Sequence, residues 1–143
     1  MLDFLVPEGL IVKIVNNVGE VTEEYYSDES SFDGDFVVLV NEVTASASEL
    51  FTQTLRDFGM AKVVGMKTYG KGTVLSSYTL PNGGNVTFST GLYTTNSGAF
   101  LEGDGIVPDY EVDLTYEKYM KRYELPIEED DQLQKALEVI RSN

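Results

Sequence analysis

The chain has 143 residues, a formal net charge of −14 at pH 7, and neither cysteine nor histidine. This length and a hydrophobic content of 42% predict a single domain, residues 1–143, with one buried core. The charge argues against nucleic acid or an anionic membrane surface as a partner and favours a polypeptide or small molecule. Without cysteine there is no thiolate site, and without histidine there is no Ser-His-Asp triad, so serine chemistry would need another base.

The N-terminal part of the chain predicts strands and turns. Residues 10–15 and 20–26 are expected to form a β-hairpin across an Asn-Asn-Val-Gly turn. Residues 27–35 predict a solvated loop, because their carboxylates lack the spacing of an EF-hand calcium site. The short, uncharged, β-branched run at 36–40 predicts a strand buried on both faces of its sheet.

An amphipathic helix is expected over residues 46–58, ended by Gly59. The residues on its apolar face are Ala47, Leu50, Phe51, Leu55 and Phe58. A second buried strand at 61–66 follows it. Strand, helix and strand within some thirty residues predict two parallel strands joined by a crossover helix.

The C-terminal part predicts a second hairpin and a last helix. Residues 73–80 and 85–93 alternate in polarity around a turn at 81–84. The residues on one face of the last helix are Leu133, Ala136, Leu137 and Ile140, with Asp130 or Asp131 as its cap. The expected fold class is therefore α/β, with parallel strands, a β-hairpin and a C-terminal helix.

Ser46 stands at the predicted junction of a strand and a helix. A hydroxyl at the first turn of a helix lies beside free backbone N–H groups and the positive end of the helix dipole, which is a favourable place to stabilise an oxyanion. Two interpretations remain open from this segment alone. Ser46 is either a nucleophile or simply the cap of a capping box with Glu49.

Lys71 lies between two glycines at the start of a predicted strand. Residues 65–71 match the first seven positions of a phosphate-binding P-loop, but Gly72 replaces the Ser or Thr that would hold magnesium, which argues against nucleotide binding. The competing functional interpretation makes Lys71 the general base for Ser46. An ordinary lysine has a pKa of about 10.4, so this role requires desolvation or nearby positive potential. An exposed hairpin lysine also explains the flanking glycines.

Several linked motifs resemble those of the C-terminal processing peptidases, also called tail-specific proteases. These motifs, in order, are Val38-Leu39-Val40-Asn41, Ser46-Ala47-Ser48-Glu49-Leu50, Val63-Val64-Gly65, Gly70-Lys71-Gly72-Thr73-Val74 and Gly105-Ile106-Val107-Pro108-Asp109, with a similar tail at 131–137. The resemblance covers nearly the whole chain. It implies a partial Clp-protease/crotonase-like fold and a serine endopeptidase that cuts protein substrates near their C-termini, without a cofactor or metal.

The resemblance also assigns roles to individual residues. It makes Ser46 the nucleophile, Lys71 its general base and the Ala47 N–H an oxyanion donor. Asp57 matches the family's third acidic residue. Because eleven helical positions span about 16 Å, Asp57 is not expected to relay a proton to Ser46, and it either supports neighbouring structure or is simply exposed near the helix end. Leu75 departs from the family, which commonly has there a Gln that orients the lysine, so Lys71 is expected to be held either by other groups or less well.

The family's catalytic domain is larger than this chain. Its N-terminal helical region, its PDZ domain and a Gly-rich segment with further oxyanion donors are expected upstream, so the isolated chain is predicted to be inactive and to expose a sheet edge through which it forms homo-oligomers. The resemblance implies an extracytoplasmic location, although the chain itself carries no signal sequence. The alternative function is a non-catalytic module that binds peptides or proteins by adding strands to that edge.

Overall fold

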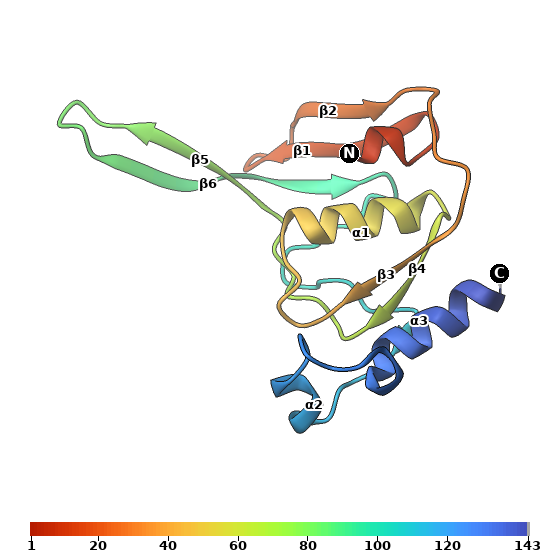
Figure 1. The fold of residues 1–143 in the computed structure, drawn as a ribbon. Coiled ribbons are helices and arrows are strands. Elements are labelled where there is room, and N and C mark those ends of the chain that lie inside the picture. Colours follow the sequence, from red (N-terminus) through yellow and green to blue (C-terminus); the bar gives the residue numbers. More distant parts are fainter. Residues whose placement is uncertain (143) are drawn as a thin grey trace.

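The computed structural model describes residues 1–142, which form two β-sheets with a helix between them (Figure 1). The elements in chain order are η1 (Leu2–Phe4), β1 (Gly9–Asn16), β2 (Val21–Ser27), β3 (Phe36–Val40), α1 (Ala47–Asp57), β4 (Ala61–Gly65), β5 (Thr73–Thr79), β6 (Asn85–Thr95), β7 (Tyr110–Glu111), α2 (Tyr116–Met120), η2 (Ile127–Glu129) and α3 (Asp131–Ser142). Both predicted hairpins, the helix after β3 and the C-terminal helix are confirmed within one or two residues.

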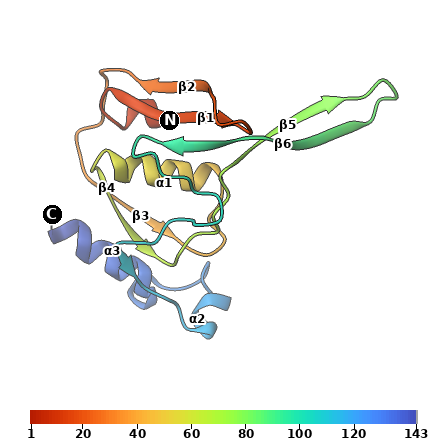
Figure 2. The ribbon, with the colours of Figure 1, turned by 180° about the vertical axis from the view of Figure 1, so that it is seen from behind.

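The antiparallel sheet has the strand order β2-β1-β6-β5. The C-terminal half of β6 pairs with β1, so that Tyr93 lies opposite Ile14. The N-terminal half of β6 pairs with β5, and this two-stranded ribbon projects from the body of the molecule (Figures 1 and 2). Along the ribbon β5 has a free edge, and so has the part of β6 before Gly91, which pairs with β5 alone.

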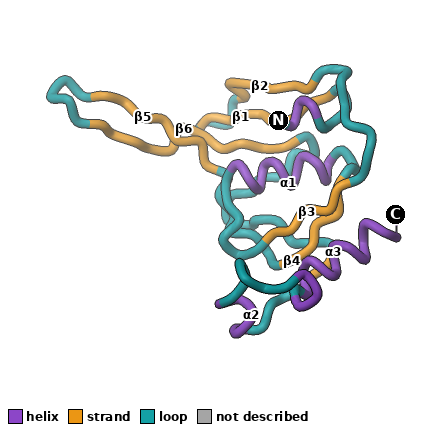
Figure 3. The backbone as a smooth tube through the Cα atoms, in the orientation of Figure 1, coloured by secondary structure: helices purple, strands orange, loops and turns teal. Residues whose placement is uncertain are grey.

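The parallel sheet has the order β3-β4-β7, with Val38 of β3 beside Val63 of β4. Helix α1 covers one face of this sheet and α3 packs against the other (Figure 3). The layers are therefore the antiparallel sheet, α1, the parallel sheet and α3. This arrangement confirms the α/β class. The run at 36–40 is less buried than the sequence predicts, because in β3 only Val40 is buried and Leu39 is 43% exposed.

The hydrophobic core surrounds α1 between the two sheets. Its buried members are Val6, Ile11, Val12, Val40, Leu55, Ala61, Val63, Tyr93, Leu101 and Ile106. Leu55 on α1 is completely buried. Burying a side chain of this size contributes about 1.5–3 kcal/mol, so the core fixes the helix and the strand ends around it.

The Gly105–Asp109 segment fastens α1 to the parallel sheet. One Asp109 carboxylate oxygen accepts a hydrogen bond from the Val63 N–H at 2.8 Å, and the other pairs with the Arg56 guanidinium at 2.6 Å. Arg56 also donates to the carbonyl of Val107 at 3.0 Å. These contacts connect the end of α1 to β4, and this motif therefore has a structural explanation in this chain.

Four short elements, η1, β7, α2 and η2, are not predicted by the sequence. Helix α2 has only five residues, which are too few to show a helical period of apolar residues. Its N-cap is Thr115, whose side chain accepts a hydrogen bond from the Lys118 N–H. For α3 the cap is Asp130, whose Oδ1 accepts from the Leu133 N–H at 3.0 Å. Within residues 1–142, no helix combines the length and the apolar character needed to cross a bilayer.

Candidate active site

Ser46 has an unusual backbone conformation. Its φ and ψ are 59° and −123°, and it is the only non-glycine residue with positive φ within residues 1–142. An ordinary N-cap residue adopts extended β-region angles. Positive φ in a residue with a side chain costs about 1–3 kcal/mol and persists where the surrounding structure enforces it. Capping alone therefore does not explain the conformation of Ser46.

Glu49 connects Ser46 to the segment that carries Lys71. Its carboxylate is completely buried. Oε2 accepts hydrogen bonds from the backbone N–H of Ser46 at 2.9 Å and of Lys71 at 2.8 Å. Oε1 accepts from the Thr68 hydroxyl at 2.5 Å and from the Gly70 N–H at 2.8 Å. One side chain thereby fixes the start of α1 relative to residues 68–71.

The buried charge of Glu49 is compensated by its surroundings. Four neutral donors satisfy its two oxygens, and within residues 1–142 no buried side-chain nitrogen or oxygen lacks a partner. Glu49 also lies in the first turn of α1, where the helix dipole favours negative charge. This carboxylate is therefore an integral part of the site and more than a surface cap.

The glycines around Lys71 allow a close approach of two backbone segments. A Cβ added at Gly70, where φ is +87°, would lie 2.9 Å from the Gly105 nitrogen. A Cβ added at Gly72 would lie 2.7 Å from the Glu102 nitrogen. The Gly72 N–H donates to Oε2 of Glu102 at 2.6 Å. Residues 70–72 are thus packed against residues 101–105, and Lys71 does not sit in a free hairpin turn.

The side chain of Lys71 is half-buried, and its ammonium forms none of the hydrogen bonds or ion pairs found within residues 1–142. Leu75 is 51% exposed and offers no polar atom to orient Lys71. The backbone of Lys71 is nevertheless held on both sides. Its N–H donates to Glu49, and its carbonyl accepts from the Tyr93 hydroxyl.

Tyr93 contributes a buried phenol to the site. Burial raises the pKa of Tyr93 to about 12, and the negative charge of Glu49 adds to the rise. A hydrogen bond with the Ser46 side chain opposes this shift in pKa, and Glu102 reinforces it. The phenol therefore remains protonated at neutral pH, in contact with Ser46 and with the carbonyl of Lys71.

A hollow of about 440 Å³ opens beside Ser46. Its lining residues are Met1, Val38, Leu39, Thr44, Ala47, Ser48, Phe51 and Thr52. Ala47 is the first residue of α1, and its N–H donates no hydrogen bond within residues 1–142. This hollow borders the unpaired edge of β3. It offers a mostly apolar space beside the first turn of α1, where the Ala47 N–H is a free donor.

Asp57 lies at the opposite end of α1 from Ser46. Its Oδ2 accepts hydrogen bonds from the Thr95 hydroxyl at 2.5 Å and from the Ser97 N–H at 3.0 Å, and its Oδ1 accepts from Gln53 at 2.7 Å. The structure therefore brings Ser46, Ala47 and Lys71 to one end of α1 and leaves Asp57 at the other. At that end, Asp57 connects α1 to the end of β6.

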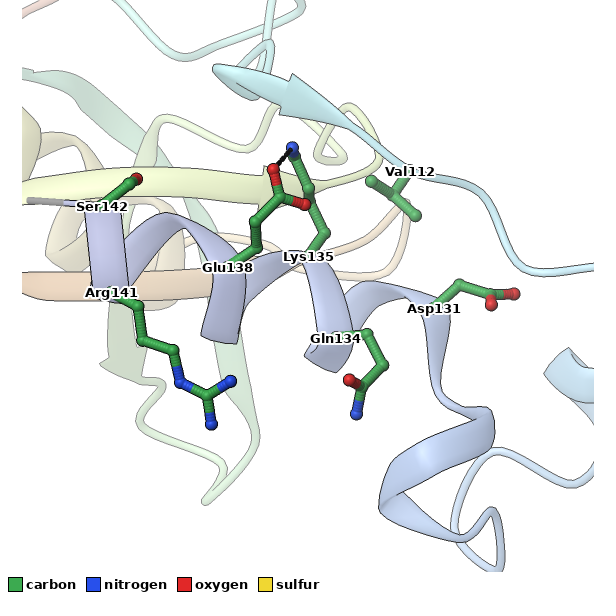
Figure 4. Close-up of a pocket in the computed structure, with 7 residues that line it drawn as sticks. All are labelled: Val112, Asp131, Gln134, Lys135, Glu138, Arg141 and Ser142. Carbon is green, nitrogen blue, oxygen red and sulfur yellow. Dashed lines mark hydrogen bonds and ion pairs between the residues drawn. The ribbon is translucent and has the colours of Figure 1, made fainter.

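A larger hollow, of about 670 Å³, runs along α3 and lies apart from this site (Figure 4). Its polar groups include the Lys135–Glu138 ion pair, with 2.8 Å between the charged atoms. Neither Ser46 nor Lys71 lines it. Neither residue lines the smaller hollow either, but Ala47 and Ser48, the first residues of α1 after Ser46, do line it.

Two residues of this site do not follow from local sequence. Glu49 has a local signal only as a capping partner of Ser46, whereas its bonds to residues 68–71 cross 19 to 22 positions. Tyr93 lies 22 positions from Lys71 and has no signal beyond strand alternation. Long-range contacts of this kind emerge only from the fold.

Comparison with known proteins gives a consistent result. Peptidase family S41 matches residues 1–112. The "Probable CtpA-like serine protease" of Staphylococcus aureus (strain N315) is 38% identical over 99 residues, which are 66% of this chain and 20% of that protein. The "Carboxyl-terminal-processing protease" of Synechocystis sp. is 34% identical over 134 residues, which are 94% of this chain and 31% of that protein.

A solved structure agrees with these relatives. The photosystem II D1 C-terminal processing protease has a TM-score of 0.72 and 34% identity, over 78% of this chain and 29% of that chain. The chain thus spans about a fifth to a third of the length of the relatives it matches.

Proposed function

Because the chain belongs to peptidase family S41, we propose that it carries the nucleophile and the general base of a serine endopeptidase of the C-terminal processing type. The observation that carries this proposal is the positive φ of Ser46 at the start of α1. Backbone strain at a residue with a nucleophilic side chain is typical of active sites. The shared Glu49 carboxylate further supports a functional pairing of Ser46 with Lys71.

In the proposed mechanism, Ser46 Oγ attacks the carbonyl carbon of the scissile peptide bond while the neutral amine of Lys71 accepts the hydroxyl proton. The resulting oxyanion receives a hydrogen bond from the Ala47 N–H. As the C–N bond breaks, Lys71 returns the proton to the leaving amine. Water then attacks the acyl-enzyme while Lys71 takes its proton, and Lys71 gives this proton to Ser46 Oγ as the acyl C–O bond breaks and the product acid leaves.

Asp57 has a supporting role in this proposal. Its bonds to Thr95 and Ser97 hold the C-terminal end of α1 against β6, which keeps the helix, and therefore Ser46, in position. The proposed partial crotonase-like fold rests on the α/β layers and on the similarity to the D1 processing protease.

The substrates of the complete protein are proposed to be polypeptides cut near their C-termini, and its location extracytoplasmic. The names of the relatives support the substrate class. The location follows from the motif resemblance to C-terminal processing peptidases. Protease protection and cell fractionation of the complete natural protein test it, and a purely cytoplasmic protein would contradict it.

Residues 1–143 alone are proposed to be the C-terminal part of a catalytic domain, with little or no activity by themselves. The chain spans only 20% to 31% of its relatives, and loss of one oxyanion donor typically costs about 100- to 1000-fold in rate. Hydrolysis of an unstructured protein by this chain and by its Ser46→Ala variant measures this. Robust cleavage that the substitution abolishes would contradict it.

The alternative function is a binding module that adds strands to a sheet edge. Two edges favour it, those of β3 and β5. No charged residue lies between Lys71 and Glu102, and the β5–β6 ribbon exposes Tyr78 and Phe88. An uncharged, apolar ribbon suits pairing with another strand, either of a peptide or of a second copy, so homo-oligomers through these edges belong to the same proposal.

One experiment separates peptidase from binding module. The complete natural protein and its Ser46→Ala variant are treated with a serine-directed acylating probe, and binding of an unstructured peptide is measured in parallel. Labelling that requires Ser46 supports the peptidase. Retained peptide binding with no labelling in either protein supports the binding module and rejects the Ser-Lys chemistry. Sedimentation of the same samples at several concentrations reports self-association.

A further inference from the structure

Residues 66–72, which carry Lys71, form no helix or strand, because β4 ends at Gly65 and β5 begins at Thr73. A lysine on such a segment has no ladder of backbone hydrogen bonds to fix it. Leu75 cannot orient the lysine either, since it is apolar and half-exposed. Other contacts must therefore determine where the Lys71 side chain begins.

Glu49 and Tyr93 supply these contacts from opposite sides. Glu49 accepts from the consecutive N–H groups of Gly70 and Lys71. Tyr93 binds consecutive carbonyls, because its hydroxyl donates to Lys71 and its backbone N–H donates to Gly72 at 2.9 Å. The peptide groups around Lys71 are thus held through both their donors and their acceptors.

The rigidity of Tyr93 makes it effective in this position. Its backbone lies in β6 opposite Ile14 of β1, and the residue is only 7% exposed within the hydrophobic core. A phenol on a central strand is a fixed donor, in contrast to a side chain on a loop. Its ring also fixes the hydroxyl against the Lys71 carbonyl.

We propose that Tyr93 is a positioning residue, whose hydroxyl holds the Lys71 backbone so that the lysine amine faces Ser46. This inference rests on the proposed Ser46–Lys71 chemistry. The elevated pKa of Tyr93, about 12, keeps its hydroxyl a neutral donor over the pH range in which a lysine base operates. Tyr93 thus orients Lys71 through the lysine backbone, a role that the apolar Leu75 side chain cannot fill.

The test uses Tyr93→Phe in the complete natural protein, with Tyr123→Phe as the control because Tyr123 is 89% exposed. Two rates are measured from pH 6 to 10. The first is the acylation of Ser46 by a serine-directed probe. The second is the acylation of the Lys71 amine, quantified by mass spectrometry relative to the acylation of the exposed Lys62 in the same sample. Loss of one hydrogen bond is worth about 1 kcal/mol, so about a fivefold or larger fall in Ser46 acylation is expected in Tyr93→Phe alone.

The Lys71 measurement keeps this inference separate from the peptidase proposal. The expected result is a changed Lys71 labelling profile in Tyr93→Phe, moving toward that of Lys62, in a protein that still unfolds cooperatively. If wild-type Ser46 never reacts, the peptidase proposal fails, and the Lys71 profile still decides the role of Tyr93. An unchanged Lys71 profile overturns the inference whether or not Ser46 reacts.

A second variant applies if Tyr93→Phe does not fold. Replacement of Tyr93 by 3,5-difluorotyrosine preserves the shape of the ring and makes the phenol ionise at lower pH. The Lys71 profile should then change at the pH where the fluorinated phenol loses its proton. A profile identical to wild type across that transition would overturn the inference.

Discussion

The buried carboxylate of Glu49 accepts a hydrogen bond from the backbone N–H of Lys71 at 2.8 Å, across 22 positions of the chain. The same oxygen accepts from the N–H of Ser46. A residue that sequence patterns identify as a helix cap therefore also serves as the physical link between the two proposed catalytic residues. Its substitution should affect both folding and chemistry.

Replacing Glu49 by Gln should destabilise the protein. The amide has one oxygen in place of two, and its NH₂ group would face backbone N–H donors, leaving buried groups unpaired. The expected loss is about 1–3 kcal/mol in the free energy of unfolding. Chemical denaturation measures it, with Glu42→Gln as the control, because Glu42 is exposed before α1. Equal stability of the two variants would contradict the bridging role.

Lys71→Ala in the complete natural protein should reduce turnover by at least about 100-fold, the usual scale for loss of a general base. Lys71→Arg should be nearly as inactive, because a guanidinium does not lose its proton in proteins. Steady-state hydrolysis of an unstructured substrate measures both, and Lys67→Arg, at an exposed lysine nearby, is the control. Substantial turnover by Lys71→Arg would remove Lys71 from the mechanism.

The sequence predicts the strands, hairpins and main helices well because each has a local cause. The uncharged, β-branched run at 36–40 forms β3, and the turns at 16–19 and 81–84 carry glycine. Element α2 is missed because five residues are too few for a period.

The candidate site is predictable only in part. Ser46 and Lys71 emerge from linked motifs, but the motifs do not reveal how the two are held. The β5–β6 register, with Thr73 opposite Leu92, brings Tyr93 beside residues 71–72, but the pattern of the hairpin does not reveal that the phenol binds the Lys71 carbonyl. The glycines beside Lys71 likewise have a visible cause only once residues 101–105 pack against them.

Ionisation of the buried Tyr93 phenol should lower the free energy of unfolding at high pH. Its pKa is raised from 10.0 to about 12 in the folded protein, so between these values the folded state binds more protons than the unfolded state. Stability from this group is therefore complete below pH 10 and is lost as the pH rises toward 12, by up to about 2–3 kcal/mol. Unfolding free energies at pH 8 and pH 11.5 measure the loss.

Because the chain has nine tyrosines, the Tyr93 effect is isolated as a difference between variants. Tyr93→Phe should lose less stability than wild type between the two pH values, whereas Tyr123→Phe, at an exposed tyrosine, should follow wild type. Parallel curves for wild type and Tyr93→Phe would show that the buried phenol has no such linkage.

The backbone of Ser46 gives the last prediction. At φ 59° and ψ −123°, alanine retains the strain of a side chain, whereas glycine relieves it. Ser46→Gly should therefore be more stable than Ser46→Ala by about 1 kcal/mol or more, although both remove the nucleophile and should be equally inactive. Thermal unfolding and probe labelling of the two variants measure this combination.

The matched control is Ser48, two residues further along and inside the first turn of α1. There the order should reverse, because glycine within a helix is less stable than alanine by about 1 kcal/mol. An ordinary N-cap position also prefers glycine to alanine, so the strain of Ser46 predicts a difference at position 46 that exceeds this cap preference. A stability order at position 46 that matches the order at position 48 would contradict the strain.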